Sequence, residues 1–293
     1  MKRLLCSITC LGLLLIYPLA INALEFELNA GVDFLAFHPD RVTAHIVSEN
    51  HGEFQTYPFG MGNFSIRNDI TDSLGFSINV ARDKILRNSL DGRLITRTDY
   101  FSVEFGPFVG IGDQVEIPDA GIIGKIGFSY PGIAFFSLSG SSTLGSRLDF
   151  TSVNYREYID FQLGFWLPFV IPILSGSTKN FVWQSEEIRT ISDTETRAML
   201  SADIHIKNVP VTVRLDGGYE ILTRSYKTGA IEIIDELSAF FAGFEINWQV
   251  TSPLKIKIGA EMPVYLIPVE PMTVPDFWTM PKAKVGVLYK VFD

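Results

Sequence analysis

The sequence predicts an all-β fold, and more narrowly a closed antiparallel barrel that crosses a membrane. Three observations predict it: apolar and polar residues alternate with a period of two, no comparable stretch shows the 3.6-residue period of a helix, and the alternating segments are about 10 to 14 residues long. An average strand has about five or six residues, whereas a tilted strand needs about 9 to 11 to cross a bilayer. The length of these segments is the first indication of a membrane.

The chain begins with a segment that is typical of a signal peptide. A basic start at Lys2 and Arg3 precedes an apolar run, and a small residue, Ala23, stands just before the expected cleavage site. We therefore expect a signal peptide at 1–23 and a single mature domain at 24–293. An uncleaved anchor is the weaker alternative, because the apolar run is short for a spanning helix and is broken by a proline.

Cysteine content and charge exclude several classes of protein. Both cysteines, Cys6 and Cys10, lie in the expected signal peptide, so the mature chain would hold neither a disulfide nor a thiolate-bound metal. The formal net charge is −9, and about −11 without the signal peptide, which argues against nucleic acid as a partner. Hydrophobic residues make up 47% of the chain and charged residues 19%, with a mean hydropathy of +0.22. No later apolar stretch is long enough to span a bilayer as a helix.

Alternating segments recur from one end of the chain to the other. In 24–34, for example, leucine, phenylalanine and valine alternate with glutamate, asparagine and aspartate. The clearest expected strands are 24–34, 74–81, 101–105, 121–140, 153–165, 201–207, 209–221, 240–250, 254–264 and 283–291.

The number of strands depends on how 121–140 is interpreted. One long strand bent at Pro131 and Gly132 gives about twelve strands, whereas a hairpin gives an odd number, which single-chain bacterial barrels rarely have. We therefore expect about 12 strands, with about 8 to 14 left open. The weakest region is 166–183, where Pro168 and Pro172 argue against a central strand.

The expected connections differ in length. Short turns are predicted at 68–72, 208–210 and 251–253, and long polar loops at 38–55, 87–97, 184–195, 224–236 and 268–281. Short turns at one side and long loops at the other are typical of an outer-membrane barrel, in which the short turns face the periplasm.

Alternation alone does not say which face meets water, because a soluble sandwich or small ligand-binding barrel also alternates. A protein core enclosed by so many long strands would be far larger than that of a small ligand-binding barrel. Turning charged residues such as Asp203 and Arg214 toward hydrocarbon would cost up to about 2–4 kcal/mol each. We therefore expect the apolar face to meet lipid and the polar face to line the lumen. The expected lumen-lining residues are Glu104, Arg156, Asp160, Asp203, His205, Arg214, Asp216, Glu220, Glu245, Lys255, Lys257 and Glu261.

Aromatic residues fall near the ends of the expected strands, where amphipathic rings favour the membrane–water interface. The candidates for these interfacial girdles are Tyr57, Trp166, Trp183, Trp248, Tyr265, Trp278 and Tyr289.

The signal-like start, the alternating strands and the final segment "KAKVGVLYKVF" resemble bacterial outer-membrane β-barrel proteins of the porin-like class, over essentially all of 24–293. The resemblance implies a location in the bacterial outer membrane, contact with its lipid, and insertion by the barrel-assembly machinery. Proteins of this class commonly end on an aromatic residue in phase with the lipid face. Here Phe292 is followed by Asp293 and is out of phase with Val291, which departs from that pattern.

Catalytic and metal-binding patterns are weak. His38, His45 and His51 share one expected loop at spacings that match no standard ligand motif, and no serine lies two positions from His205. We therefore expect no enzymatic activity, no cofactor and no metal.

Three functions are compatible with the expected barrel. The favoured one is a polar, charge-lined passage for small hydrophilic solutes or ions, because both signs of charge occur on neighbouring inward faces. The alternative is a structural or adhesin barrel whose lumen is filled by salt bridges. A carrier of hydrophobic compounds is less expected, since it would need an apolar tunnel and a lateral opening near Pro168 and Pro172.

Overall fold

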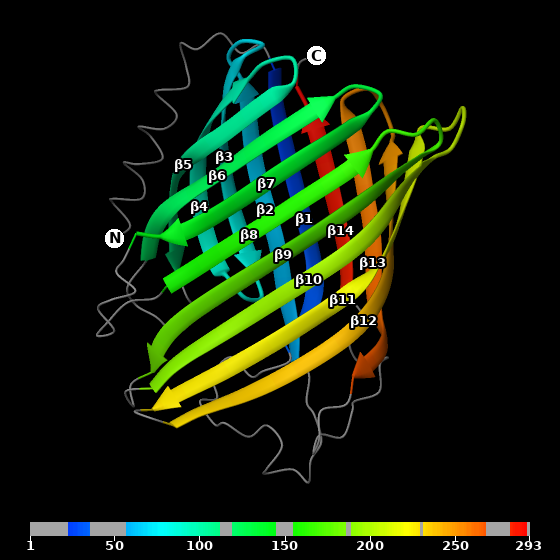
Figure 1. Cartoon of the computed structure of the whole chain (residues 1–293). Helices are drawn as coiled ribbons and strands as arrows, with labels where there is room; N and C mark the ends of the chain where they lie inside the picture. Colours follow the sequence, from blue (N-terminus) through cyan, green and yellow to red (C-terminus); the bar gives the residue numbers. More distant parts are fainter. Residues whose placement is uncertain are drawn as a thin grey trace.

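The chain folds into one closed antiparallel β-barrel, as the alternation predicts (Figure 1). The computed structural model describes residues 23–35, 57–111, 119–144, 155–185, 189–228, 231–267 and 282–291. Each strand pairs with its neighbours in sequence, and β1 pairs with β14 to close the ring. No helix in these ranges is long and apolar enough to cross a membrane.

The strands of the barrel in the described ranges are β1 (Ala23–Leu35), β2 (Tyr57–Asp69), β3 (Leu74–Asp83), β4 (Arg87–Arg97), β5 (Phe101–Ile111), β6 (Asp119–Tyr130), β7 (Ala134–Thr143), β8 (Tyr155–Phe165), β9 (Val170–Ser185), β10 (Arg189–His205), β11 (Val211–Thr228), β12 (Ile231–Gln249), β13 (Leu254–Ile267) and β14 (Lys282–Lys290).

The expected count of about twelve strands is wrong, because the described ranges form a closed ring of fourteen. The segment 121–140 is the hairpin β6–β7, whose turn contains Gly132 at a φ of 76°, a conformation that glycine adopts without strain. The segment 87–97, expected as a loop, is strand β4. Its outward positions include only two large apolar residues, Leu90 and Leu94, so the alternation is too sparse to recognise.

The expected loops 184–195 and 224–236 are also wrong, because strands occupy most of both segments. Strands β9 to β12 are 16 to 19 residues long and extend well beyond the length that a bilayer requires. Outside the bilayer a strand needs no apolar outer face, so its sequence is polar and resembles a loop.

Pro168 and Pro172 do not interrupt the barrel. Pro168 lies in the turn between β8 and β9, and Pro172 is near the start of β9, paired with Ala202 of β10 without a register shift. On the other side of β9 the pairing with β8 already ends at Ile173, so the missing N–H of Pro172 removes little from the ladder. A lateral opening at these prolines is therefore not supported.

The two rims of the barrel follow from the strand order. The turns 70–73, 98–100, 131–133, 166–169, 206–210 and 250–253 join even-numbered strands to the next odd-numbered strand, on the rim where β1 begins and β14 ends. We call this the short-turn rim, and the opposite one the loop rim. The turns predicted near 70, 208 and 252 are confirmed.

The outer face is apolar and the inner face is polar. Leu94, Phe105 and Leu200 point outward and are 56%, 57% and 64% exposed, whereas Arg156, Glu195 and Arg224 point inward and are at most 2% exposed. A soluble barrel would show the reverse distribution. Hydrocarbon chains therefore cover the outer face, and closure leaves no strand edge unpaired in lipid.

Several expectations fall on residues outside the described ranges. They are nearly all of the expected signal peptide, the loops 38–55 and 268–281, the histidines His38, His45 and His51, and Trp278.

Candidate constriction of the lumen

The turn between β3 and β4, residues 84–86, folds into the barrel. β3 and β4 are only 10 and 11 residues long, so their turn ends below the upper parts of β9 to β12. Lys84 and Ile85 are 3% and 6% exposed. The Asp83 carboxylate closes the turn by accepting the N–H groups of Ile85 and Leu86 at 2.8 and 3.0 Å, as aspartate commonly does in turns.

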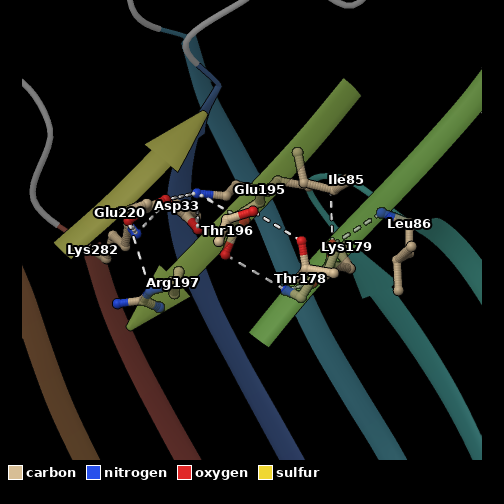
Figure 2. A network of polar contacts seen from close by, with 12 residues as sticks. Asp33, Ile85, Leu86, Thr178, Lys179, Glu195, Thr196, Arg197, Glu220 and Lys282 are labelled. Atoms are coloured by element: carbon tan, nitrogen blue, oxygen red, sulfur yellow. Dashed lines mark hydrogen bonds and ion pairs between the residues drawn. The ribbon is translucent and has the colours of Figure 1, made fainter. Parts of the chain in front are cut away.

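Lys84 connects this turn to distant strands. Its Nζ lies 2.6 Å from Glu220 Oε1 of β11, 3.3 Å from Glu195 Oε2 of β10 and 3.4 Å from Asp33 Oδ2 of β1. Figure 2 shows these three carboxylates converging from separate strands. In the strand order, β10 and β11 lie on the opposite side of the ring from β3 and β4. The contact therefore crosses the lumen.

The charge of Lys84 is fixed by its surroundings. Burial alone would lower its pKa, but the carboxylates of Asp33, Glu195 and Glu220 raise the pKa well above its ordinary value. Lys84 is therefore protonated at any physiological pH.

A chain of alternating charges continues from Glu220 along the wall. Glu220 Oε2 lies 2.6 Å from Lys282 Nζ of β14, and Lys282 lies 3.1 Å from Glu261 Oε1 of β13. The other oxygen of Glu261 accepts a hydrogen bond from Arg197 of β10 at 2.6 Å. On the other side of the turn, Lys179 Nζ of β9 donates to Asp83 Oδ2 at 2.7 Å.

A second set of contacts holds the β4 side of the turn. Arg224 of β11 binds Asp193 of β10 with two hydrogen bonds of 2.5 and 2.7 Å, and Arg87 Nη2 lies 3.3 Å from the same carboxylate. The Arg224 guanidinium also lies over the Trp183 ring, 5.4 Å from its centroid.

Arg156 of β8 connects the end of the turn and the start of β4 to Asp119 of β6. Its guanidinium binds both oxygens of Asp119 at 2.6 and 2.7 Å. It also donates to the backbone carbonyls of Leu86 and Asn88 at 2.5 and 3.1 Å. Gly110 of β5 leaves the space for this side chain, because a Cβ there would collide with the guanidinium.

We call this set the cross-lumen bridge. It contains equal numbers of acidic and basic residues, so its formal charge is balanced: Asp33, Asp83, Lys84, Arg87, Asp119, Arg156, Lys179, Asp193, Glu195, Arg197, Glu220, Arg224, Glu261 and Lys282. Removing so many charges from water is costly, and their mutual attraction offsets that cost only where the geometry is good. The number of ion pairs in the bridge is therefore weak evidence that the bridge stabilises the fold, and its position in the lumen bears on function.

The lumen is wetter toward the short-turn rim. Ion pairs there are partly exposed: Arg214 and Asp203 are 31% and 18% exposed although they are 2.5 Å apart. A pocket of about 450 Å³ opens at this rim beside Glu25, Arg67, Asp69 and Lys290. The structure thus combines an open chamber at the short-turn rim with a narrow region at the bridge.

The predicted lumen residues all lie on strands of the barrel at inward-facing positions. Arg156, Glu220 and Glu261 belong to the bridge. His205 is exposed at the last position of β10, with Nδ1 3.1 Å from Thr212 Oγ1. Nearer the short-turn rim than the bridge are Glu104, Asp160, Asp203, Arg214, Asp216, Glu245, Lys255 and Lys257. In the described ranges no group of three or more His, Cys, Asp or Glu is arranged to hold a metal ion.

Sequence reasoning missed most of the bridge. Arg87, Asp193, Glu195 and Arg224 lie in segments that were expected to be loops, and Lys84 lies beside one of them. The signal that could have found Asp193 and Glu195 is their alternation with Thr194 and Thr196, which continues the inward pattern of β10.

One of the interfacial aromatic predictions is wrong. Trp183 faces inward, is 4% exposed and stacks on Phe181 with ring centroids 5.4 Å apart. It lies above the bilayer-length part of β9, where an aromatic ring packs inside the barrel. Trp166, Trp248, Tyr265 and Tyr289 are exposed, the first in the turn after β8 and the others on the outer face. The side chain of Tyr57 is outside the described part.

Comparisons with known proteins show the fold. No family model matches the chain, and no curated sequence matches it significantly. An outer membrane channel from Pseudomonas putida F1 has a similar structure, with a TM-score of 0.52 and 9% identity over 93% of this chain and 96% of that one.

Two other solved structures are more distant. In-vitro folded OmpT, an outer membrane protein of Vibrio cholerae, has a TM-score of 0.44 and 9% identity, covering 92% of this chain and 98% of its own. An anion-selective porin from Comamonas acidovorans has a TM-score of 0.37 and 9% identity, covering 92% and 99%. The closed barrel and its apolar outer face are those of an outer-membrane β-barrel.

Proposed function

We propose that this protein is an outer-membrane channel for small hydrophilic solutes or ions. The observation that carries the proposal is the charged inner face of the barrel, which continues from the short-turn rim to the bridge while the outer face is apolar. A lumen of this kind holds water and polar solutes, because both signs of charge and many small polar side chains line it. The fold shared with the Pseudomonas putida channel is consistent with transport rather than catalysis.

The bridge limits the size of the solute. It brings side chains from opposite walls into hydrogen-bond distance, so the path beside it is narrow. We therefore infer passage of ions and small polar molecules, not of large nutrients.

Planar-bilayer recording of the refolded chain 24–293 tests the channel. Discrete conductance steps that scale with salt concentration are the expected result. The protein should first be shown to be folded by heat-modifiable migration on a detergent gel, which reports a closed barrel. Folded protein that inserts but produces no steps, together with no swelling of sugar-loaded liposomes, would contradict the proposal.

The bridge also favours a second candidate, a structural or adhesin barrel with a filled lumen. Its ion pairs occupy the centre of the barrel, as expected for a rigid platform that supports external loops. The same planar-bilayer recording separates the two functions, because neither a structural platform nor any variant of it conducts ions.

A further inference from the structure

We infer that the turn 84–86 between β3 and β4 is a movable stopper that gates the channel, with the ion pairs of Lys84 as its latch. This inference rests on the proposed channel function and adds its regulation. The stopper belongs to one short hairpin, whereas two partners of Lys84, Glu195 and Glu220, lie within long, fully paired strands on the other side of the barrel. Moving the turn therefore requires no wall strand to separate from its neighbour.

The turn narrows the lumen in this structure. A cavity beside Lys84, between the turn and strands β1 and β11 to β14, measures about 30 Å³. By this measure a single water molecule needs about 10–15 Å³, so the cavity has room for about two waters. A solute larger than a few water molecules can pass beside Lys84 only if the turn moves to a second position.

The contacts between stopper and wall are of a reversible kind. Lys84 of the turn and the adjacent Asp83 are joined to the wall by ion pairs, such as Lys84–Glu220 at 2.6 Å and Lys179–Asp83 at 2.7 Å. An ion pair loses its mutual attraction when it opens, but both charges regain hydration. The closed and open states can therefore lie close in free energy, which an apolar plug would not allow.

Backbone strain is stored at the edge of the stopper. Arg87, the first residue of β4, has a φ of 60°, in the left-handed region that a bulky side chain rarely adopts. Its contact with Asp193 across the lumen helps to hold this conformation. Strained residues of this kind concentrate at switch segments.

A cysteine pair tests the stopper directly. The chain from residue 24 onward has no cysteine, so Lys84→Cys with Glu220→Cys introduces a single pair of thiols. The double variant removes the latch, and a short bifunctional thiosulfonate reagent then replaces it with a covalent link that a reductant reverses. If the closed state dominates in the wild type, the open fraction is of the order of 0.1–10%.

The expected result has three steps. Before cross-linking, the mean current of the double variant rises about tenfold or more over wild type, as the open fraction approaches one. Cross-linking lowers the current below that of wild type, and reduction restores it. A matched control, Asp203→Cys with Arg214→Cys, joins neighbouring strands nearer the short-turn rim, and its current should not respond to the reagent.

Two outcomes would overturn the inference in distinguishable ways. If the cross-linked Lys84→Cys, Glu220→Cys protein conducts as well as the open form, with the link verified by mass, solutes do not pass the stopper. If neither wild type nor any variant conducts, the channel function fails as well. As a milder check, Lys84→Met should raise the current, while Lys207→Met, in an exposed turn, should not. Only protein with heat-modifiable migration is recorded, which excludes misfolded variants.

Discussion

Replacing Arg156 by methionine tests whether water is excluded from the ion pairs of the cross-lumen bridge. Arg156 and Asp119 are 2% and 1% exposed and are joined by two hydrogen bonds of 2.6 and 2.7 Å. Methionine fills much of the same space without a charge, so Asp119 becomes a buried carboxylate without a cation. Breaking a buried pair in this way costs about 3–5 kcal/mol. We expect the free energy of unfolding to fall by that amount.

Urea titration of the barrel refolded in lipid vesicles provides the measurement, followed by tryptophan fluorescence and by heat-modifiable migration. The double variant Arg156→Met, Asp119→Leu removes the remaining charge and should recover most of the loss. The matched control is Arg214→Met. Its pair with Asp203 has similar distances of 2.5 and 2.8 Å, but the side chains are 31% and 18% exposed, so the expected cost is about 0–1 kcal/mol.

The comparison between the two arginines decides the question. Equal costs for Arg156→Met and Arg214→Met would mean that water reaches both pairs equally. The bridge would then not seal the lumen, and the reasoning that makes the turn 84–86 a constriction would be refuted.

Three further predictions use the same preparation. Phe105→Arg, on the lipid face near the middle of β5, should lower the free energy of unfolding by about 2–4 kcal/mol. Ser102→Arg, on the inner face of the same strand, should lower it much less. Equal costs for the two variants would refute the face assignment. Brominated lipids should quench the fluorescence of a variant whose only tryptophan is Trp248, which is 48% exposed. They should not quench a variant whose only tryptophan is Trp183, which is 4% exposed. Stronger quenching of Trp183 than of Trp248 would mean that the two placements are reversed. Gly110→Val should destabilise the barrel, because the valine side chain would collide with Arg156. Gly60→Val should be tolerated, because no atom lies within 4 Å of a Cβ at that position. Equal urea midpoints for the two variants would disprove the contact between Gly110 and Arg156.

The sequence predicts the two faces of the barrel well where strands cross lipid. The period of two is imposed there by two different solvents, hydrocarbon outside and water inside, so each residue's parity reveals its side. Asp203, Arg214 and Glu245 are inward-facing neighbours on β10, β11 and β12, as their spacing indicates.

The same rule explains the failures. Where β9 to β12 rise above the membrane, water lies on both sides and no alternation is required, so the polar segment that contains Asp193 and Glu195 resembles a loop. The bridge is harder still to predict, because Lys84 and Glu220 are separated by 136 positions in the sequence. No local sequence pattern indicates that two such distant residues are in contact. Predicting the pair requires the order of the strands around the barrel.

Unequal strand heights are what make the constriction possible. In a barrel with all strands of one length, every turn of the loop rim would end at the same level and face open water. Here the low hairpin β3–β4 stands opposite the tall strands β10 and β11, so its turn meets their inward charges instead of solvent. Lengthening β3 and β4 by two residues each would preserve the parity of both strands but raise the turn above Glu195 and Glu220. The bridge is therefore a consequence of wall height, and a barrel with such a hairpin should lose its constriction while keeping its fold.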